Sequence, residues 1–115
     1  MQLNETETMA MEISKIIREK LKGKVFSTEI YNIIDDVNHR QFKIRFLAYD
    51  YFYVVFQYEK DIIGCAIEQG NNIYIPLLKG QHCYSSENLG NYFNMMADEL
   101  ELRIPDKFLK ARGWL

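Results

Sequence analysis

The period of the hydrophobic pattern changes at Val25, and this change limits the folds that the chain can adopt. Before it, apolar residues recur every three or four positions across residues 5–22, which predicts an amphipathic helix. After it, β-branched and aromatic residues dominate and the period becomes two, which predicts strands. The five predicted strands are residues 25–34, 41–48, 51–58, 62–68 and 72–77.

The connections between these strands decide how they pair. Each connection is too short to contain a crossover helix, so consecutive strands must pair antiparallel and form a meander. The first strand has an alternative, because Ser27, Thr28 and Glu29 followed by an apolar run also fit a short helix. The sequence therefore does not decide whether residues 25–34 form a strand or a helix.

The N-terminal helix has boundary signals at both ends. Asn4 can cap its first turn, with Glu7 three residues later in the capping-box position. Gly23 supplies the left-handed residue at which helices end. We therefore expect the helix to end just before Gly23.

Two further helices are predicted near the C-terminus. Residues 86–102 carry a wide apolar stripe after a cap at Ser85-Ser86. The proline that opens residues 105–112 fits the first position of a short last helix, which Gly113 ends. Trp114 then anchors the terminus on the core.

The length of 115 residues fits one domain, so we treat residues 1–115 as a single unit. The predicted fold class is α+β. It consists of an antiparallel meander of four to five strands with an N-terminal helix and one or two C-terminal helices packed on it.

Alternation within the strands assigns their faces. In residues 41–48 the apolar side chains point to one side and Lys43 and Arg45 to the other, so this strand has one wet face. Residues 51–58 are apolar on both faces, which is typical of a central strand or of a face reserved for a partner. A three-residue turn would align the apolar positions of the two strands and leave the tyrosines beside Lys43 and Arg45. The sequence leaves that register open.

No group of residues in the chain matches a catalytic, metal-binding or phosphate-binding motif. His39 and His82 lie in predicted loops with no nucleophile held beside them. Cys65 and Cys83 lie too far apart for a metal-ligand pair, and we expect them to be small buried hydrophobes. We therefore expect a protein that is not an enzyme, without catalytic residues, cofactor or metal. A small Cys/His enzyme that depends on Cys83 is a third alternative.

The charge balance argues against a nucleic-acid partner. Lys and Arg number 14 against 16 Asp and Glu, a net charge of −2, whereas phosphate binding needs a basic patch. Aromatic side chains beside Lys43 and Arg45 leave base stacking as an alternative. No leader opens the chain and no apolar run could span a bilayer, so we expect a cytoplasmic protein without membrane contact.

The C-terminal segment carries a resemblance to a known family. Residues 99–114 read Glu-Leu-Glu-Leu-Arg-Ile-Pro-Asp-Lys-Phe-Leu-Lys-Ala-Arg-Gly-Trp. This segment resembles the ending of small immunity proteins from bacterial contact-dependent growth inhibition and related polymorphic-toxin systems. In those proteins a helix runs into an L-R-I-P-D-K-[FY]-L pattern and the chain stops at Gly-Trp. The resemblance implies a protein that binds one cognate toxin domain, often a nuclease, one to one and neutralises it by occlusion.

Acidic and aromatic side chains would contact the basic active-site cleft of such a toxin. Side chains of this kind cluster in the predicted loops and strand ends. The candidate partner-binding residues are Asp35, Asp36, Tyr49, Asp50, Tyr51, Glu59 and Asp61.

A second family gives an alternative function. Type III secretion chaperones are also small, acidic α/β proteins, and their exposed apolar strands and helices hold an unfolded effector segment. They usually act as homodimers, and the symmetric dimer buries a large apolar face. A stable dimer would favour this alternative, whereas a monomer that pairs with one folded toxin would favour the immunity protein.

Overall fold

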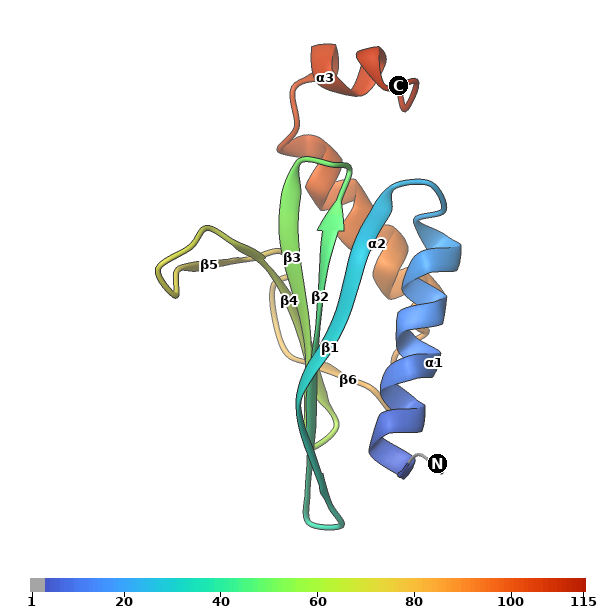
Figure 1. Cartoon of the computed structure of the whole chain (residues 1–115), viewed down its shortest axis with the longest axis vertical. Coiled ribbons are helices and arrows are strands. Elements are labelled where there is room, and N and C mark those ends of the chain that lie inside the picture. The colour runs from blue at the N-terminus through green and yellow to red at the C-terminus, as the bar shows by residue number, and fades with distance from the viewer. Residues whose placement is uncertain (1–3) are drawn as a thin grey trace.

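A single antiparallel sheet with helices against one of its faces forms the molecule (Figure 1). The computed structural model describes residues 4–115. The elements in order are α1 (Glu5–Lys20), β1 (Val25–Asp36), β2 (His39–Ala48), β3 (Phe52–Glu59), β4 (Ile62–Glu68), β5 (Tyr74–Pro76), β6 (His82–Cys83), α2 (Leu89–Leu102) and α3 (Asp106–Ala111). The predicted α+β class and the order of helix, meander and helices are confirmed.

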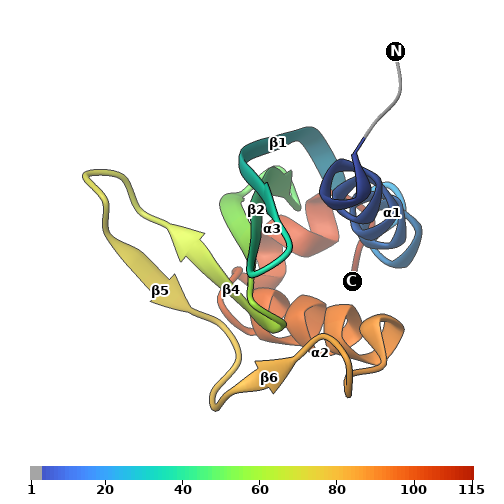
Figure 2. The same ribbon diagram turned by 90° about the horizontal axis from the view of Figure 1, so that it is seen from below.

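The strands follow one another in the sheet in the order β1-β2-β3-β4-β5, and each neighbouring pair is antiparallel. The outer edge of β4 has two short partners. β5 lies beside residues 66–68, and β6, which the sequence did not predict, lies beside residues 62–63. The segment that contains β5 extends away from the helices (Figure 2).

Residues 25–34 are strand rather than helix. They belong to β1, which pairs with β2 over its whole length apart from two bulges. Ser27 and Asn32, each with a φ of 54°, lie in these bulges. Because each bulge inserts one extra residue, the alternation of apolar and polar positions shifts within β1, which explains why its sequence pattern was ambiguous.

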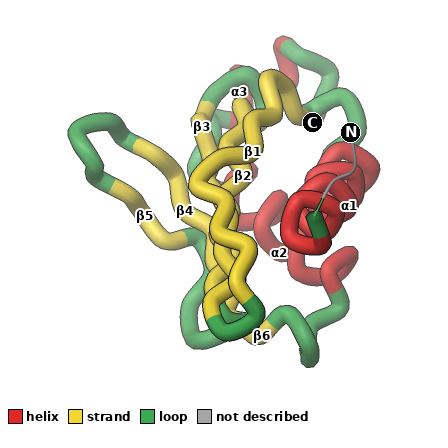
Figure 3. The backbone as a smooth tube through the Cα atoms, turned by 60° about the horizontal axis from the view of Figure 1, so that its bottom comes forward, coloured by secondary structure: helices red, strands yellow, loops and turns green. Residues whose placement is uncertain are grey.

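Helices α1 and α2 cover one face of the sheet, and within residues 4–115 no helix covers the other (Figure 3). The core lies between the helices and the covered face. Phe56 of β3 is at its centre, with ring centroids 6.4 Å from Phe42, 6.2 Å from Tyr92 and 5.5 Å from Phe93. Strands β2 and β3 and helix α2 therefore meet through aromatic side chains that water does not reach.

Strands β2 and β3 pair in the register that aligns the apolar positions of the two strands. Ile44 lies opposite Phe56, and the predicted tyrosine position beside Arg45 is occupied by Tyr53. The turn holds three residues, 49–51, as that alignment requires, because Ala48 pairs with Phe52. Tyr49 and Asp50 have φ values of 57° and 52°, a geometry that matches the twist of a hairpin.

Helix α2 begins at Leu89, three residues later than predicted. Its cap is Asn88, whose side chain accepts a hydrogen bond from the backbone of Asn91 (3.0 Å). Ser85 does not cap the helix, because its hydroxyl donates to Asp61 (2.6 Å) on the β3–β4 turn. This bond between residues far apart in sequence competes with the local cap that the sequence suggested.

The C-terminus is anchored on the core as predicted. Trp114 packs edge-to-face on Tyr49, with 5.5 Å between ring centroids. Arg112 donates to Asp50 (2.7 Å), which ties the end of α3 to the β2–β3 turn. Helix α3 thereby closes one end of the sheet (Figure 1).

Candidate functional site

The uncovered face of the sheet, called the open face below, carries a set of exposed apolar side chains. Its residues alternate along each strand with those that face the core, as Tyr53 alternates with the buried Val54. Grouped exposed apolar residues of this kind mark interaction sites on proteins. The large apolar side chains on this face, each about 40% exposed, are Phe26, Ile34, Tyr53, Ile62 and Tyr74.

One end of the open face is organised around Arg45. Its guanidinium lies 3.8 Å over the Tyr53 ring and donates to Oε2 of Glu68 from Nε (3.0 Å) and Nη2 (2.8 Å). The hydrogen bond to Glu68 raises the pKa of Arg45. Burial is the main cause that raises the pKa of Tyr31 in the same cluster, and the nearby Tyr74 and Glu68 raise it further. The charge of Arg45 is thus compensated within the molecule.

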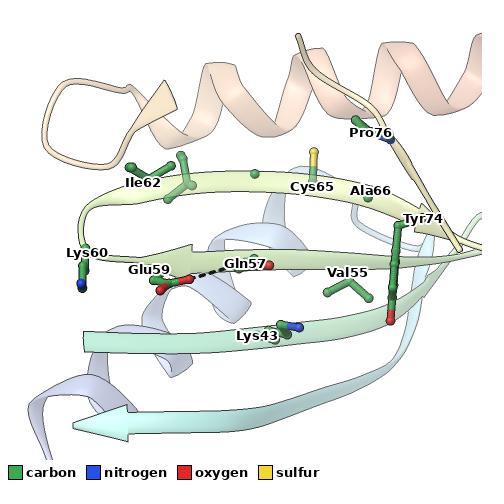
Figure 4. Close-up of a pocket in the computed structure, with 12 residues that line it drawn as sticks. Lys43, Val55, Gln57, Glu59, Lys60, Ile62, Cys65, Ala66, Tyr74 and Pro76 are labelled. Atoms are coloured by element: carbon green, nitrogen blue, oxygen red, sulfur yellow. Dashed lines mark hydrogen bonds between the residues drawn. The ribbon is translucent and has the colours of Figure 1, made fainter. Parts of the chain in front are cut away.

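A hollow of about 540 Å³ lies in the middle of the open face (Figure 4). Val55, Gly64 and Ala66 of the paired strands β3 and β4 line it. Tyr74 of β5 reaches across the strands at one side, and Lys43 of β2 lies near Val55. The volume falls within the range of roughly 300–1,000 Å³ typical of ligand sites.

Acidic side chains outnumber Lys and Arg side chains on the open face and the rim of the hollow. Such a surface gives no excess of positive charge for a phosphate backbone. Base stacking on the aromatic side chains therefore has no electrostatic support here. The charged residues are Lys43, Arg45 and Lys60 against Glu29, Asp36, Glu59 and Glu68.

Four of the seven predicted site residues lie together at one end of the sheet. Asp35 and Asp36 lead into the β1–β2 turn, and Glu59 and Asp61 belong to the β3–β4 turn beside it. The two turns are linked by a hydrogen bond from the Lys60 backbone to the Arg40 carbonyl (3.0 Å). We call Asp35, Asp36, Glu59 and Asp61 the acidic end.

Each residue of the acidic end also has a structural contact. Asp35 accepts from Thr6 (2.5 Å), Asp36 from the Asn38 backbone (2.8 Å), and Asp61 from Ser85. Glu59 lies 3.3 Å from the His39 ring. These contacts orient the carboxylates. Val37, 94% exposed at the tip of the hairpin, is an apolar side chain among them.

The other three predicted residues lie at the opposite end of the sheet. Tyr49 is fully buried, and its hydroxyl donates to Glu101 (2.5 Å), so it does not belong to a surface. Asp50 is paired with Arg112. Tyr51 is 41% exposed and packs on Phe108. The seven residues therefore do not form one patch, since a strand of eight residues separates the two ends by roughly 27 Å.

His82 and Cys65 have structural partners. Cys65 is buried as expected, whereas Cys83 is only half-buried. Nδ1 of His82 lies 2.5 Å from Glu87 and its Nε2 lies 2.9 Å from the Lys79 carbonyl, and these hydrogen bonds raise the pKa of His82. Burial raises the pKa of the Cys65 thiol to about 11, and the hydroxyl of Tyr92 donates to its sulfur (3.6 Å). A buried thiol of this kind is not activated as a nucleophile. Within residues 4–115, no three His, Cys, Asp or Glu side chains are placed to share a metal ion.

The sequence prediction missed the hollow on the open face. Lys43 was assigned to a wet face and considered only for base stacking, and Tyr74 belonged to the last predicted strand. The one available signal was Gly64, an isolated glycine within a predicted strand. Such a glycine suggests a bulge or the close approach of another group.

No family model, curated protein or solved structure matches this chain. Among the helices in residues 4–115, none has the length and apolar character needed to cross a bilayer.

Proposed function

We propose that this protein is an immunity protein, which acts in the cytoplasm by binding one cognate toxin domain, a nuclease, and blocking its active site. The acidic end is the observation that carries this proposal. Four carboxylates from two adjacent turns lie around an exposed apolar tip. Arg40 nearby is paired with Glu5 of α1 (3.0 Å), and Lys60 is the other cation there. The resemblance of residues 99–114 to immunity proteins supports the same function.

The proposed mechanism is stoichiometric occlusion and requires no chemistry from this chain. A nuclease cleft is basic because it holds a phosphate backbone, so a group of carboxylates attracts it and speeds the encounter. Val37 would then enter the cleft as an apolar anchor, since anchors of this kind hold such complexes together. The contacts of Asp35 and Asp36 within the molecule orient them before binding, which lowers the entropy lost on association.

Growth rescue tests the proposal. The toxin domain would be the C-terminal part of a secreted protein encoded beside this chain, and it would be expressed with and without this chain in the same cells. Restored growth, together with a one-to-one complex in solution, is expected. Cells that die equally in both cases would rule out the immunity function.

Charge reversal tests the surface. Asp36→Lys keeps the bond between Asp35 and Thr6, and it should slow association and make binding less sensitive to salt. Asp35→Lys with Asp36→Lys should strengthen both effects. A matched control is Glu12→Lys with Glu19→Lys, which makes the same charge change on the exposed side of α1. If the control weakens binding as much as the reversal of Asp35 and Asp36, the acidic end is not the binding surface.

One observation favours the second candidate, a chaperone-like homodimer that holds an effector segment. The open face exposes grouped apolar side chains that a symmetric dimer would bury. Light scattering on the free protein separates the two functions. A stable dimer at micromolar concentration favours the chaperone, and a monomer that forms a one-to-one complex with a folded toxin favours the immunity protein.

A further inference from the structure

Gly64 lies in the middle of β4, and no contact or backbone geometry in the described residues explains why a glycine stands there. It pairs with Gln57 in an unbroken register, so it does not mark a bulge. Its φ lies outside the left-handed region, and a Cβ added to it would meet no atom within 4 Å. Glycine weakens a strand, and its remaining use in strands is to let another molecule approach the backbone closely.

The surroundings of Gly64 show what could approach. The glycine lines the hollow of about 540 Å³. Gln57 lies opposite it on β3 and donates to Glu59 (3.4 Å). The other side chains near it in the lining are apolar: Val55, Ala66, Ile62 and the ring of Tyr74. An apolar side chain of a partner would fill such a space and displace water from it.

A cation lies beside this apolar space. Lys43 lines the hollow and makes no ion pair within residues 4–115, in contrast to Arg45, which is held by Glu68. Glu59, the acid on the rim, lies against the His39 ring. The group that best complements Lys43 is therefore a carboxylate supplied from outside.

We propose that the hollow above Gly64 binds a segment of a partner protein in which a large apolar side chain lies next to an Asp or Glu. The apolar side chain packs over Gly64, between Val55 and Tyr74, and the carboxylate pairs with Lys43. This surface is separate from the acidic end, and the inference does not require the partner to be a toxin.

A protein segment fits better than a nucleic acid, because the open face carries no excess of positive charge. The surface combines an apolar hollow, exposed tyrosines and charges of both signs, and this combination is typical of protein interfaces. Tyr53 and Tyr74, each about 40% exposed, flank the site and add contact area at low entropic cost.

Selection from a library of random short peptides displayed on phage tests the proposal. The full chain would be immobilised and the selection repeated on Gly64→Leu, which fills the hollow at a position with free space and ordinary φ. The expected peptides pair an aromatic or large aliphatic residue with an adjacent acid. Their affinity, measured with synthetic peptide, should fall about tenfold or more in Gly64→Leu.

Two further variants separate the parts of the proposal. Lys43 lies on the solvent side of β2, so Lys43→Glu should lower the affinity for the selected peptides and remove the preference for an acidic residue in them. Lys15→Glu makes the same charge change on the exposed side of α1 and should leave peptide binding unchanged. The proposal is overturned if no peptide is selected, if the selected peptides lack the acid, or if they bind Gly64→Leu as well as the natural chain. A free protein that is a dimer, and becomes a monomer in Gly64→Leu, would also overturn it, since a second copy would then occupy the hollow.

Discussion

Removing the hydroxyl of Tyr49 should destabilise the protein, although the residue lies in a turn. The ring is fully buried, and the hydroxyl donates to Oε2 of Glu101 on α2 at 2.5 Å. Burial, and then the bond to Glu101, raise the pKa of Tyr49, so the phenol stays neutral and remains a donor. Tyr49→Phe keeps the ring, its contact with Trp114 and the positive φ of 57°, so the change isolates the hydrogen bond.

The expected loss in the free energy of unfolding follows from the charge of the acceptor, Glu101. A hydrogen bond to a charged group contributes about 1.5–3 kcal/mol, and the lower half of that range applies because Glu101 is partly exposed. For a chain of this length, a loss of 1.5 kcal/mol corresponds to a fall in Tm of roughly 6–9 °C. Urea unfolding followed by circular dichroism would measure the free energy of unfolding, with an unchanged m-value expected.

Tyr51 supplies the matched control, since it lies two residues away and is 41% exposed. Tyr51→Phe should change the free energy of unfolding by less than about 0.5 kcal/mol. If Tyr49→Phe changes it as little as Tyr51→Phe, the buried hydrogen bond does not hold α2 to the β2–β3 turn, and the reasoning is refuted.

Two further predictions concern stability. Gly64→Val should raise the free energy of unfolding by about 0.5–1 kcal/mol, because glycine loses more conformational freedom on folding and the added side chain meets open space. Gly23→Val should lower the free energy of unfolding by about 1–2 kcal/mol, because Gly23 has a φ of +77°. Equal melting temperatures of the two variants would contradict this prediction. The bonds to Glu87 and the Lys79 carbonyl raise the pKa of His82 above 6.5 in the folded state. The stabilisation from these two hydrogen bonds should therefore be complete below pH 6.5 and be lost as pH rises through the raised pKa. Tm measured from pH 5 to 9 should show this fall in the natural chain and not in Glu87→Gln.

Local signals carried most of the fold prediction. Asn4 and Glu7 form the predicted capping box, and the hairpin turns brought the apolar positions of β2 and β3 into line. The errors arose where a distant contact decided the local structure. Helix α2 begins late because Ser85 bonds to Asp61, 24 residues away, and no local pattern contains that bond.

The candidate site was harder to predict, because a charge or an aromatic ring in a loop does not tell whether it contacts its own molecule. Tyr49 resembles an exposed turn residue in the sequence, and its burial depends on Trp114 at the far end of the chain. Asp35 and Glu59 were named because they are acids at predicted strand ends and loops, and the pairing of three strands is what brings them to one end.

The bulges at Ser27 and Asn32 have a consequence for how this protein can change partners. β1 is an edge of the sheet, and its irregular backbone opposes the addition of another strand there. The proposed binding surfaces, the open face and the acidic end, consist instead of side chains that do not take part in the core around Phe56. Substitutions on these surfaces can therefore alter specificity while the fold stays intact, so one scaffold could serve many different partners.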